Sequence, residues 1–200
     1  MSGVRTRTRL STQARREQLL NVGVELFANQ PYEDVAIEQV AAVADVSRGL
    51  LYHYFPTKRV FFAAVIQHVG EQMLEMTDTD PDLPVPQRVA AGLDAYLDYA
   101  KTRGPGFRAF HRAAGNDDPA VRTAYENNLA RQEERLFAAL TDNAADLGID
   151  GRPPAIVRLA VRGWLAFVIS VTGGWLDDPA LSQSDVRDLC VRALVNALSP

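Results

Sequence analysis

Residues 35–58 read VAIEQVAAVADVSRGLLYHYFPTK and contain two short helical patterns. The first pattern places apolar residues on one face of a helix, at Ile37, Val40, Ala41 and Ala44. The second places Leu51 and Phe55 four residues apart, on the buried side of the next helix. A gap of about three residues separates the patterns, which is the length of the turn in a helix-turn-helix motif.

The second of these helices is expected to run from Ser47 to Phe55. The Ser47 hydroxyl can accept a backbone N–H of the first turn, and Pro56 cannot continue a helix. The outer face of the helix carries hydrogen-bond donors and flat rings and no acid, at Arg48, Gly49, Tyr52, His53 and Tyr54. Such a face is suited to lie against the sugar-phosphate backbone of DNA.

The string VSRGLLYHYFPTK, residues 46–58, strongly resembles the DNA-reading motif of TetR-family transcriptional repressors, as does the amphipathic helix expected over residues 12–29. The resemblance implies an all-α fold with a helix-turn-helix headpiece in residues 1–58 and a helical ligand-binding and dimerisation domain in residues 59–200. It implies a ligand-responsive regulator, in most cases a repressor, and not an enzyme. Such a regulator binds a palindromic operator as a homodimer and is released by a small, hydrophobic effector.

Two positions depart from the family pattern. Val35 and Ala36 stand where the family has a Thr or Ser that caps the first helix of the motif and touches phosphate. Asp34 is available as a cap instead, but its carboxylate would be repelled by phosphate, so we expect no DNA contact there. Asp45 replaces the usual glycine of the turn, and Asp tolerates the left-handed backbone conformation.

Residues that match the family motif, together with the arginines of the N-terminal arm, are the candidate DNA-binding residues. They are Arg5, Arg7, Arg9, Ser47, Arg48, Gly49, Tyr52, His53, Tyr54, Thr57 and Lys58. Arg48 is the expected base reader, with guanine as its geometrically natural target. Thr57 is expected to cap the next helix and, with Lys58, to hold a phosphate at its N-terminus.

The remaining motif residues have more open roles. Gly49 lets the helix backbone approach the duplex closely, unless it is an accidental helix glycine. Tyr52 and Tyr54 resemble the phosphate-contacting positions of the family. For one of the two, packing into the headpiece is as well supported as a phosphate contact. His53 is either a DNA contact or an ordinary exposed histidine.

The charge distribution favours DNA binding despite a net charge of −4. Residues 1–62 carry eight Lys and Arg against six Asp and Glu, and the other 138 residues carry thirteen against nineteen. Five arginines and no acid precede Glu17. The arm is expected to lie along phosphate or to reach into a minor groove; the alternative is a solvated tail that aids solubility.

Composition argues for a cytoplasmic protein without cofactor or metal. A single cysteine, Cys190, excludes an internal disulfide and fits a reducing compartment. The longest apolar run without charge, residues 164–176, is shorter than the roughly 20 residues of a membrane span, so we expect no membrane contact. The three histidines are far apart and no catalytic constellation is visible. Alternative functions are a helical enzyme with a hydrophobic pocket, and a helix-turn-helix protein that contacts only proteins.

Helical periodicity continues to the C-terminus. A connecting helix is expected from Thr57 to about Met76, followed by a proline-rich loop and then by helices over residues 86–103, 107–114, 118–146, 154–176 and 184–198. Residues 104–106, Gly-Pro-Gly, are expected to interrupt the helical pattern between the helix over 86–103 and the helix over 107–114. In the long helix over 118–146, residues 131 and 133–135 are expected to point mostly outward.

The last two expected helices predict a homodimer. Residues 154–176 are apolar on most faces, and a helix of this kind must be covered on all sides. Pairing with a symmetry mate in a four-helix bundle would cover it and would make the DNA site a palindrome. The alternative is a well-buried pair of helices in a monomer.

Aromatic and polar side chains of the second domain are candidates for lining a small-molecule pocket. They are Met73, Tyr96, Phe107, Phe110, His111, Tyr125, Asn128, Trp164 and Phe167. A mostly apolar pocket with a few polar groups suits a hydrophobic effector. For each of these residues the alternative is a plain core position.

Overall fold

The computed structural model describes residues 10–178 and 180–199, which form helices and no strand. The expected all-α class is therefore correct. The elements are α1 (Thr12–Asn29), α2 (Ile37–Val43), α3 (Arg48–Tyr54), α4 (Lys58–Met76), α5 (Val85–Thr102), α6 (Gly104–Arg112), the 3-10 turn η1 (Ala113–Gly115), α7 (Pro119–Asp142), α8 (Pro154–Asp177) and α9 (Gln183–Leu198).

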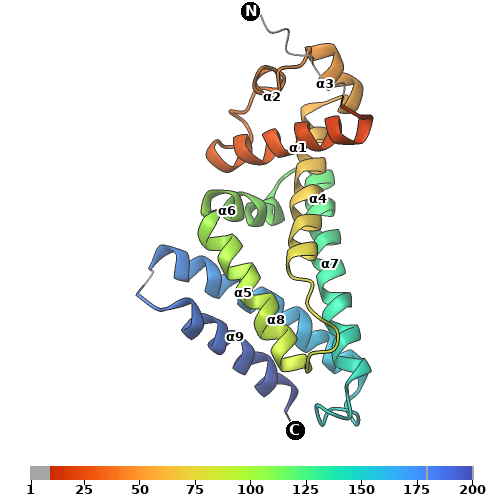
Figure 1. Cartoon of the computed structure of the whole chain (residues 1–200), viewed down its shortest axis with the longest axis vertical. Coiled ribbons are helices and arrows are strands. Elements are labelled where there is room, and N and C mark those ends of the chain that lie inside the picture. Colours follow the sequence, from red (N-terminus) through yellow and green to blue (C-terminus); the bar gives the residue numbers. More distant parts are fainter. Residues whose placement is uncertain (1–9, 179, 200) are drawn as a thin grey trace, which may run out of the picture.

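The helices are arranged along one long axis (Figure 1). Helices α1 to α3 form one end of the molecule, and α5, α8 and α9 form the other. Helices α4 and α7 lie side by side between the two ends, and α6 packs under α1. Because α4 begins in the headpiece and ends among the C-terminal helices, it connects the two physically.

Helix caps in the headpiece are largely as the sequence predicts. The Ser47 hydroxyl accepts from the Leu50 N–H at 3.1 Å, and the Thr57 hydroxyl accepts from the Val60 N–H at 3.1 Å. Asp45 adopts the left-handed conformation with φ of 53°. Asp34, which was available as a cap, is not used as one, because α2 begins after Ala36 and has no side-chain cap.

The headpiece core contains apolar side chains of α1 together with the faces that the sequence predicted for α2 and α3. Leu19, Phe27, Val40, Ala41, Leu51 and Phe55 are buried, and Leu26 packs against them partly buried. The same apolar cluster continues through Phe61 of α4 to Phe107 of α6 and Tyr125 of α7. A domain boundary after residue 58 therefore stays a prediction, since the buried side chains run across it.

A second apolar cluster joins α5, α8 and α9. Two boundaries in this half of the chain differ from the prediction by three or more residues, and one of them is the end of α7, at Asp142 and not near residue 146. Residues 104–106 do not break the chain but form the first turn of α6, which starts at Gly104. The first turn accepts Pro105 because its backbone nitrogen needs no intrahelical partner there.

Helix α8 is more apolar than the sequence count suggested. By length and composition it could cross a membrane, with a mean hydropathy of 1.7 over its best 18-residue window. The uncharged run over residues 164–176 starts only after Arg162. The helix itself starts earlier, at Pro154, and includes Arg158 and Arg162. Only 28% of that window is buried inside the chain, so α8 leaves apolar surface uncovered.

Candidate DNA-binding and ligand-binding sites

Helix α3 presents the expected polar face to solvent. The Arg48 side chain is 70% exposed, and Gly49, Tyr52 and His53 are also exposed. Tyr54 is half-buried, packs against the headpiece core and meets the edge of the His53 ring at 5.6 Å between centroids. Of the two tyrosines, Tyr52 is therefore the one free to contact a partner, and Tyr54 is the one that packs inward.

Arg48 has a neighbour that the sequence did not reveal. A guanidinium nitrogen of Arg48 lies 3.8 Å from a carboxylate oxygen of Glu38 on α2. Both side chains are well exposed, and an exposed pair of this kind contributes at most about 1 kcal/mol. Glu38 therefore orients Arg48 weakly and leaves it available to a stronger acceptor.

Gly49 is not needed by the packing of the chain. A Cβ atom built at Gly49 would have no other described atom of the protein within 4 Å. Its missing side chain leaves a flat area on the outer face of α3, where another molecule can approach the backbone.

Lys58 is held in place at the start of α4. Its ammonium donates to the Glu33 carbonyl oxygen at 3.0 Å and lies 4.5 Å from the centroid of the Tyr32 ring. The loop between α1 and α2 thus fixes the position of this charge. Arg5, Arg7 and Arg9 lie outside the described residues.

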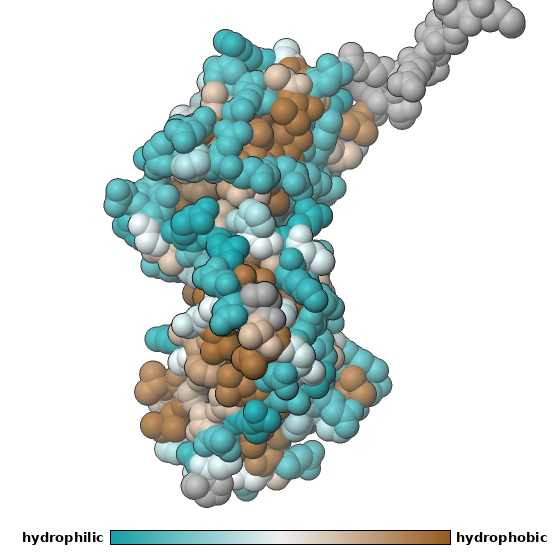
Figure 2. Space-filling view, turned by 90° about the vertical axis from the view of Figure 1, so that its left-hand side faces the viewer, coloured by the Kyte–Doolittle hydropathy of each residue, from teal (hydrophilic) through white to brown (hydrophobic). Residues whose placement is uncertain are grey.

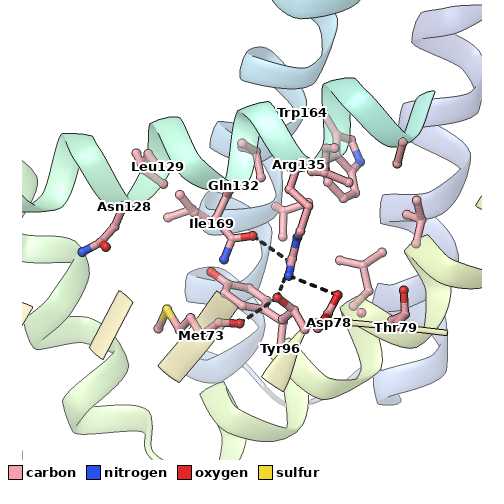
Figure 3. A pocket seen from close by; sticks show the side chains of 18 of the residues that line it. Met73, Asp78, Thr79, Tyr96, Asn128, Leu129, Gln132, Arg135, Trp164 and Ile169 are labelled. Atoms are coloured by element: carbon pink, nitrogen blue, oxygen red, sulfur yellow. Dashed lines mark hydrogen bonds and ion pairs between the residues drawn. The ribbon is translucent and has the colours of Figure 1, made fainter. Parts of the chain in front are cut away.

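A cavity of about 130 Å³ lies between α4, α5, α7 and α8, with α6 at one end (Figure 3). Six of the nine predicted pocket residues line it: Met73, Tyr96, Phe110, His111, Asn128 and Trp164. The other three do not. Phe107 and Tyr125 are buried behind the cavity wall against His111, and Phe167 packs on the second apolar cluster.

His111 connects two tyrosines at one end of the cavity. Its Nε2 lies 3.2 Å from the Tyr96 hydroxyl, and its Nδ1 lies 2.9 Å from the Tyr125 hydroxyl. Burial lowers the pKa of His111 to about 4, so the ring is neutral near pH 7. A neutral imidazole has one N–H, and it therefore donates to one tyrosine and accepts from the other.

Arg135 enters the cavity from α7, contrary to the prediction that it points outward (Figure 3). Its guanidinium donates to the Leu74 carbonyl at 2.6 Å, to the Thr77 hydroxyl at 2.5 Å and to the Gln132 amide oxygen at 2.9 Å. Leu74 and Thr77 are at the C-terminal end of α4. Arg135 therefore ties α7 to the last turn of α4.

The sequence held a signal for this orientation. Gln132 and Arg135 follow Asn128 by four and seven positions, the spacing of residues on one helix face. Asn128 was expected to line the pocket. Gln132 and Arg135 lie on the same face of the helix, so they could have been expected to face the pocket as well. Glu133 is also buried rather than outward, because Arg162 of α8 donates two hydrogen bonds to its carboxylate, at 3.0 and 3.1 Å. These bonds lower the pKa of Glu133.

Comparison with known proteins supports a regulator. Residues 19–65 match the family model described as bacterial regulatory proteins, tetR family. The HTH-type transcriptional activator FasR of Mycolicibacterium smegmatis is 28% identical over 184 residues, which cover 88% of this chain and 78% of FasR. The relatives found are named as transcriptional regulators and not as enzymes, so the enzyme alternative is set aside.

Solved structures share the fold over nearly the whole chain. A tetR-family transcriptional regulator from Streptomyces coelicolor has a TM-score of 0.76 at 24% identity, covering 94% of this chain and 82% of that one. The regulator FadR from Bacillus subtilis, solved in complex with stearoyl-CoA, has a TM-score of 0.75 at 16% identity, covering 92% and 99%.

Proposed function

Because the chain belongs to the TetR family of bacterial transcriptional regulators, we propose that it binds a palindromic DNA operator as a homodimer and leaves it when a small effector binds. The observation that carries this proposal is the face of α3 on which Arg48, Gly49 and Tyr52 are exposed to solvent. A bound dimer would exclude other proteins from a promoter, so the expected effect on transcription is repression, in the cytoplasm.

In this proposal α3 enters the major groove. Arg48 at its first turn reads a base edge, and Gly49 lets the backbone come close to the duplex. Tyr52, Thr57 and Lys58 hold phosphates on either side of the groove, and these contacts position the protein without specifying sequence. His53 lies on the same exposed face and is assigned to a contact with the DNA backbone.

The proposed dimer interface is an apolar stripe on α8 and α9. On α8 it consists of exposed residues three or four positions apart: Ile156, Leu159, Gly163, Ala166, Ser170 and Gly174. Leu189 and Val195 of α9 are exposed apolar residues as well. Figure 2 shows apolar surface on the C-terminal half of the molecule, below the headpiece. A two-fold axis through such a stripe would bury it, and the two α3 helices would have to lie about 34 Å apart to enter successive major grooves.

Effector binding would act through α4. The N-terminus of α4 carries Thr57 and Lys58, and its C-terminus is held by Arg135 in the cavity wall. An effector that fills the cavity would favour a different position of α4 and so a different spacing of the two headpieces. That a regulator of this fold, FadR, was solved with stearoyl-CoA supports a ligand-binding role for the C-terminal helices.

A selection experiment tests the proposal. The full chain is incubated with a pool of random DNA duplexes, and bound duplexes are sequenced after several rounds. We expect an inverted repeat whose half-sites are separated by about one helical turn, with binding that weakens steeply as salt is raised. No enriched sequence at low salt would overturn the proposal and would favour the alternative in which the motif contacts only proteins.

A further inference from the structure

One end of the cavity, beside the loop between α4 and α5, is lined by two arginines. Arg135 comes from α7, and Arg88 comes from α5. The Nε of Arg88 is buried and has no hydrogen-bond partner in the described part of the chain, and no ion pair of Arg88 is found there either. A buried donor without an acceptor is costly, so the site lacks an acceptor that a ligand can supply.

The positive charge at this end of the cavity is only partly neutralised by the residues that line it. The close partners of Arg135 are uncharged oxygen atoms. The nearest carboxylate, that of Asp78, is 4.0 Å from Arg135, and its side chain is 77% exposed (Figure 3). Asp78 itself lines the cavity, so two arginines face one exposed carboxylate at this end, and the balance of charge there is positive.

The rest of the cavity is apolar and elongated. Its α7 wall runs from Asn128 to Ala139, about 16 Å along the helix at 1.5 Å per residue. Apolar side chains from the neighbouring helices complete it, among them Val89, Leu93 and Trp164. At the far end, the hydrogen bonds of Tyr96 and His111 are already made within the protein.

We propose that this cavity, the effector site of the proposed function, binds an amphiphile with one unbranched apolar chain and one acidic head group. Arg88 and Arg135 hold the head group, since a guanidinium matches the two oxygens of a carboxylate or phosphate. The apolar chain lies along α7 toward Tyr96. The cavity thus selects an effector both for its apolar chain and for the negative charge of its head group.

Binding of such a head group changes the contacts of α4. A charged acceptor forms stronger hydrogen bonds with a guanidinium than the Leu74 carbonyl and the Thr77 hydroxyl do. The volume of about 130 Å³ is also small beside ordinary ligand pockets of roughly 300–1,000 Å³, so side chains of the cavity wall must move to admit a chain. The ligand therefore takes Arg135 away from the last turn of α4.

Four probes of matched length or charge test the proposal: dodecanoate, dodecyl phosphate, dodecanol and butyrate. Their binding to the full chain is measured by calorimetry and by the fluorescence of Trp164 and Trp175. We expect dodecanoate or dodecyl phosphate to bind at least about tenfold more tightly than dodecanol, and butyrate to bind weakest. The preference between the first two tells whether the head group is a carboxylate or a phosphate. Equal affinity for dodecanoate, dodecyl phosphate and dodecanol, or no binding of any, overturns the proposal.

Variants locate the head group. Arg88→Gln and Arg135→Gln are each expected to weaken binding of the acidic probe about tenfold and to leave dodecanol binding unchanged. Arg88→Gln is the cleaner variant, because the side chain of Arg88 forms no hydrogen bond with the described residues that the substitution would remove. Arg131→Gln is the control, since Arg131 is on the same helix but is exposed, pairs with Glu71 at 3.8 Å and does not line the cavity. Unchanged affinity in both Arg88→Gln and Arg135→Gln overturns the assignment.

Amphiphile binding and DNA binding can be tested separately, so a wrong ligand assignment can be told apart from a wrong proposed function. Binding of duplex DNA is measured on the same preparations. Sequence-specific DNA binding without a preference for acidic amphiphiles overturns only the ligand assignment, whereas amphiphile binding without any DNA binding overturns only the regulator proposal.

Discussion

At the scale of single residues, His111 shows how burial turns a titratable group into a structural one. It lies between Tyr96 and Tyr125, and both of its ring nitrogens have a hydroxyl neighbour. Because burial disfavours the imidazolium, the folded protein keeps this ring neutral at a pH where an exposed histidine would begin to charge. Protonation is therefore coupled to unfolding.

We expect the free energy of unfolding to fall as the pH drops from about 6.5 toward 4. The pKa of His111 is about 4 in the folded protein and near 6.5 in the unfolded chain, so the unfolded state binds the extra proton in this range. Between pH 7 and pH 5 the loss is about 2 kcal/mol. Urea unfolding at the two pH values measures it. If His111→Gln loses as much stability between these pH values as the wild type does, His111 is not the responsible group.

Arg48 and Lys58 are expected to affect DNA binding in different ways. Arg48→Ala should lower affinity for the selected operator by about 1–3 kcal/mol and have little effect on random duplex, because a base contact carries sequence information. Lys58→Ala should weaken both to a similar extent, because a phosphate contact carries none. Fluorescence anisotropy with labelled duplexes at fixed salt measures both. Equal losses on both duplexes for Arg48→Ala would refute base reading.

Residue-level expectations from the sequence were best where the chemistry is local. The caps by Ser47 and Thr57 and the left-handed Asp45 depend on a few neighbouring residues, and all three were predictable. The inward position of Arg135 was not predicted, because charge alone was taken to place it in solvent. Its partners, Leu74 and Thr77, are distant in the sequence and become neighbours only when α4 and α7 pack.

At the scale of elements, α4 and α7 approach closely at one glycine. A Cβ atom at Gly70 would lie 2.0–2.4 Å from the side-chain amide of Asn128, which donates to the Ile66 carbonyl at 3.1 Å. No side chain fits there unless the helices separate or that hydrogen bond breaks. The contact between the connecting helix and the cavity wall therefore depends on this position.

Two glycine substitutions should have opposite effects. Gly70→Ala is expected to lower the free energy of unfolding by about 1–3 kcal/mol through overpacking. Gly49→Ala should raise it slightly, by about 0.5–1 kcal/mol, because α3 has free space there and alanine favours a helix. Chemical unfolding of the two variants measures this difference.

The same Gly49→Ala protein should bind DNA more weakly, and a variant with unchanged affinity would show that close backbone approach is not needed.

Periodicity predicted where helices lie better than where they begin or end, and α7, for example, ends four residues before its predicted end. Helix α1 was predicted with its observed bounds, and α4 to within one residue, because Pro31 and Pro56 stand close to their ends. Helix α6 starts three residues before its predicted start, since Gly-Pro-Gly was taken as a break although proline is compatible with a first turn. The cavity needs four helices to meet and could be predicted only as a set of candidate residues.

At the scale of the whole molecule, the apolar stripe on α8 sets the expected assembly. Leu159 is 64% exposed in a chain whose other large apolar residues are mostly buried, and glycines of the same helix have free space around them. Small residues let two helices approach closely, and large exposed apolar ones gain most from being covered. The sequence predicted this feature, because α8 is apolar on too many faces for its own chain to cover.

Leu159→Glu is expected to break the dimer while leaving the subunit folded. A carboxylate buried in an apolar interface is strongly unfavourable, so the dissociation constant should rise about a hundredfold or more. Leu83→Glu is the matched control, because Leu83 is also an exposed leucine but is located in the loop before α5. Size-exclusion chromatography with light scattering measures both. A Leu159→Glu protein that remains dimeric would place the interface elsewhere.

The number of chains on one operator duplex tests most directly whether the protein binds DNA as a dimer. Sedimentation of the full chain with a duplex that carries the selected site, at low salt, gives the mass of the complex. Two chains per duplex are predicted, with Leu159→Glu binding the same duplex far more weakly. A complex containing a single chain, or no complex at all, would contradict the claim that two copies joined through α8 and α9 bind one stretch of DNA.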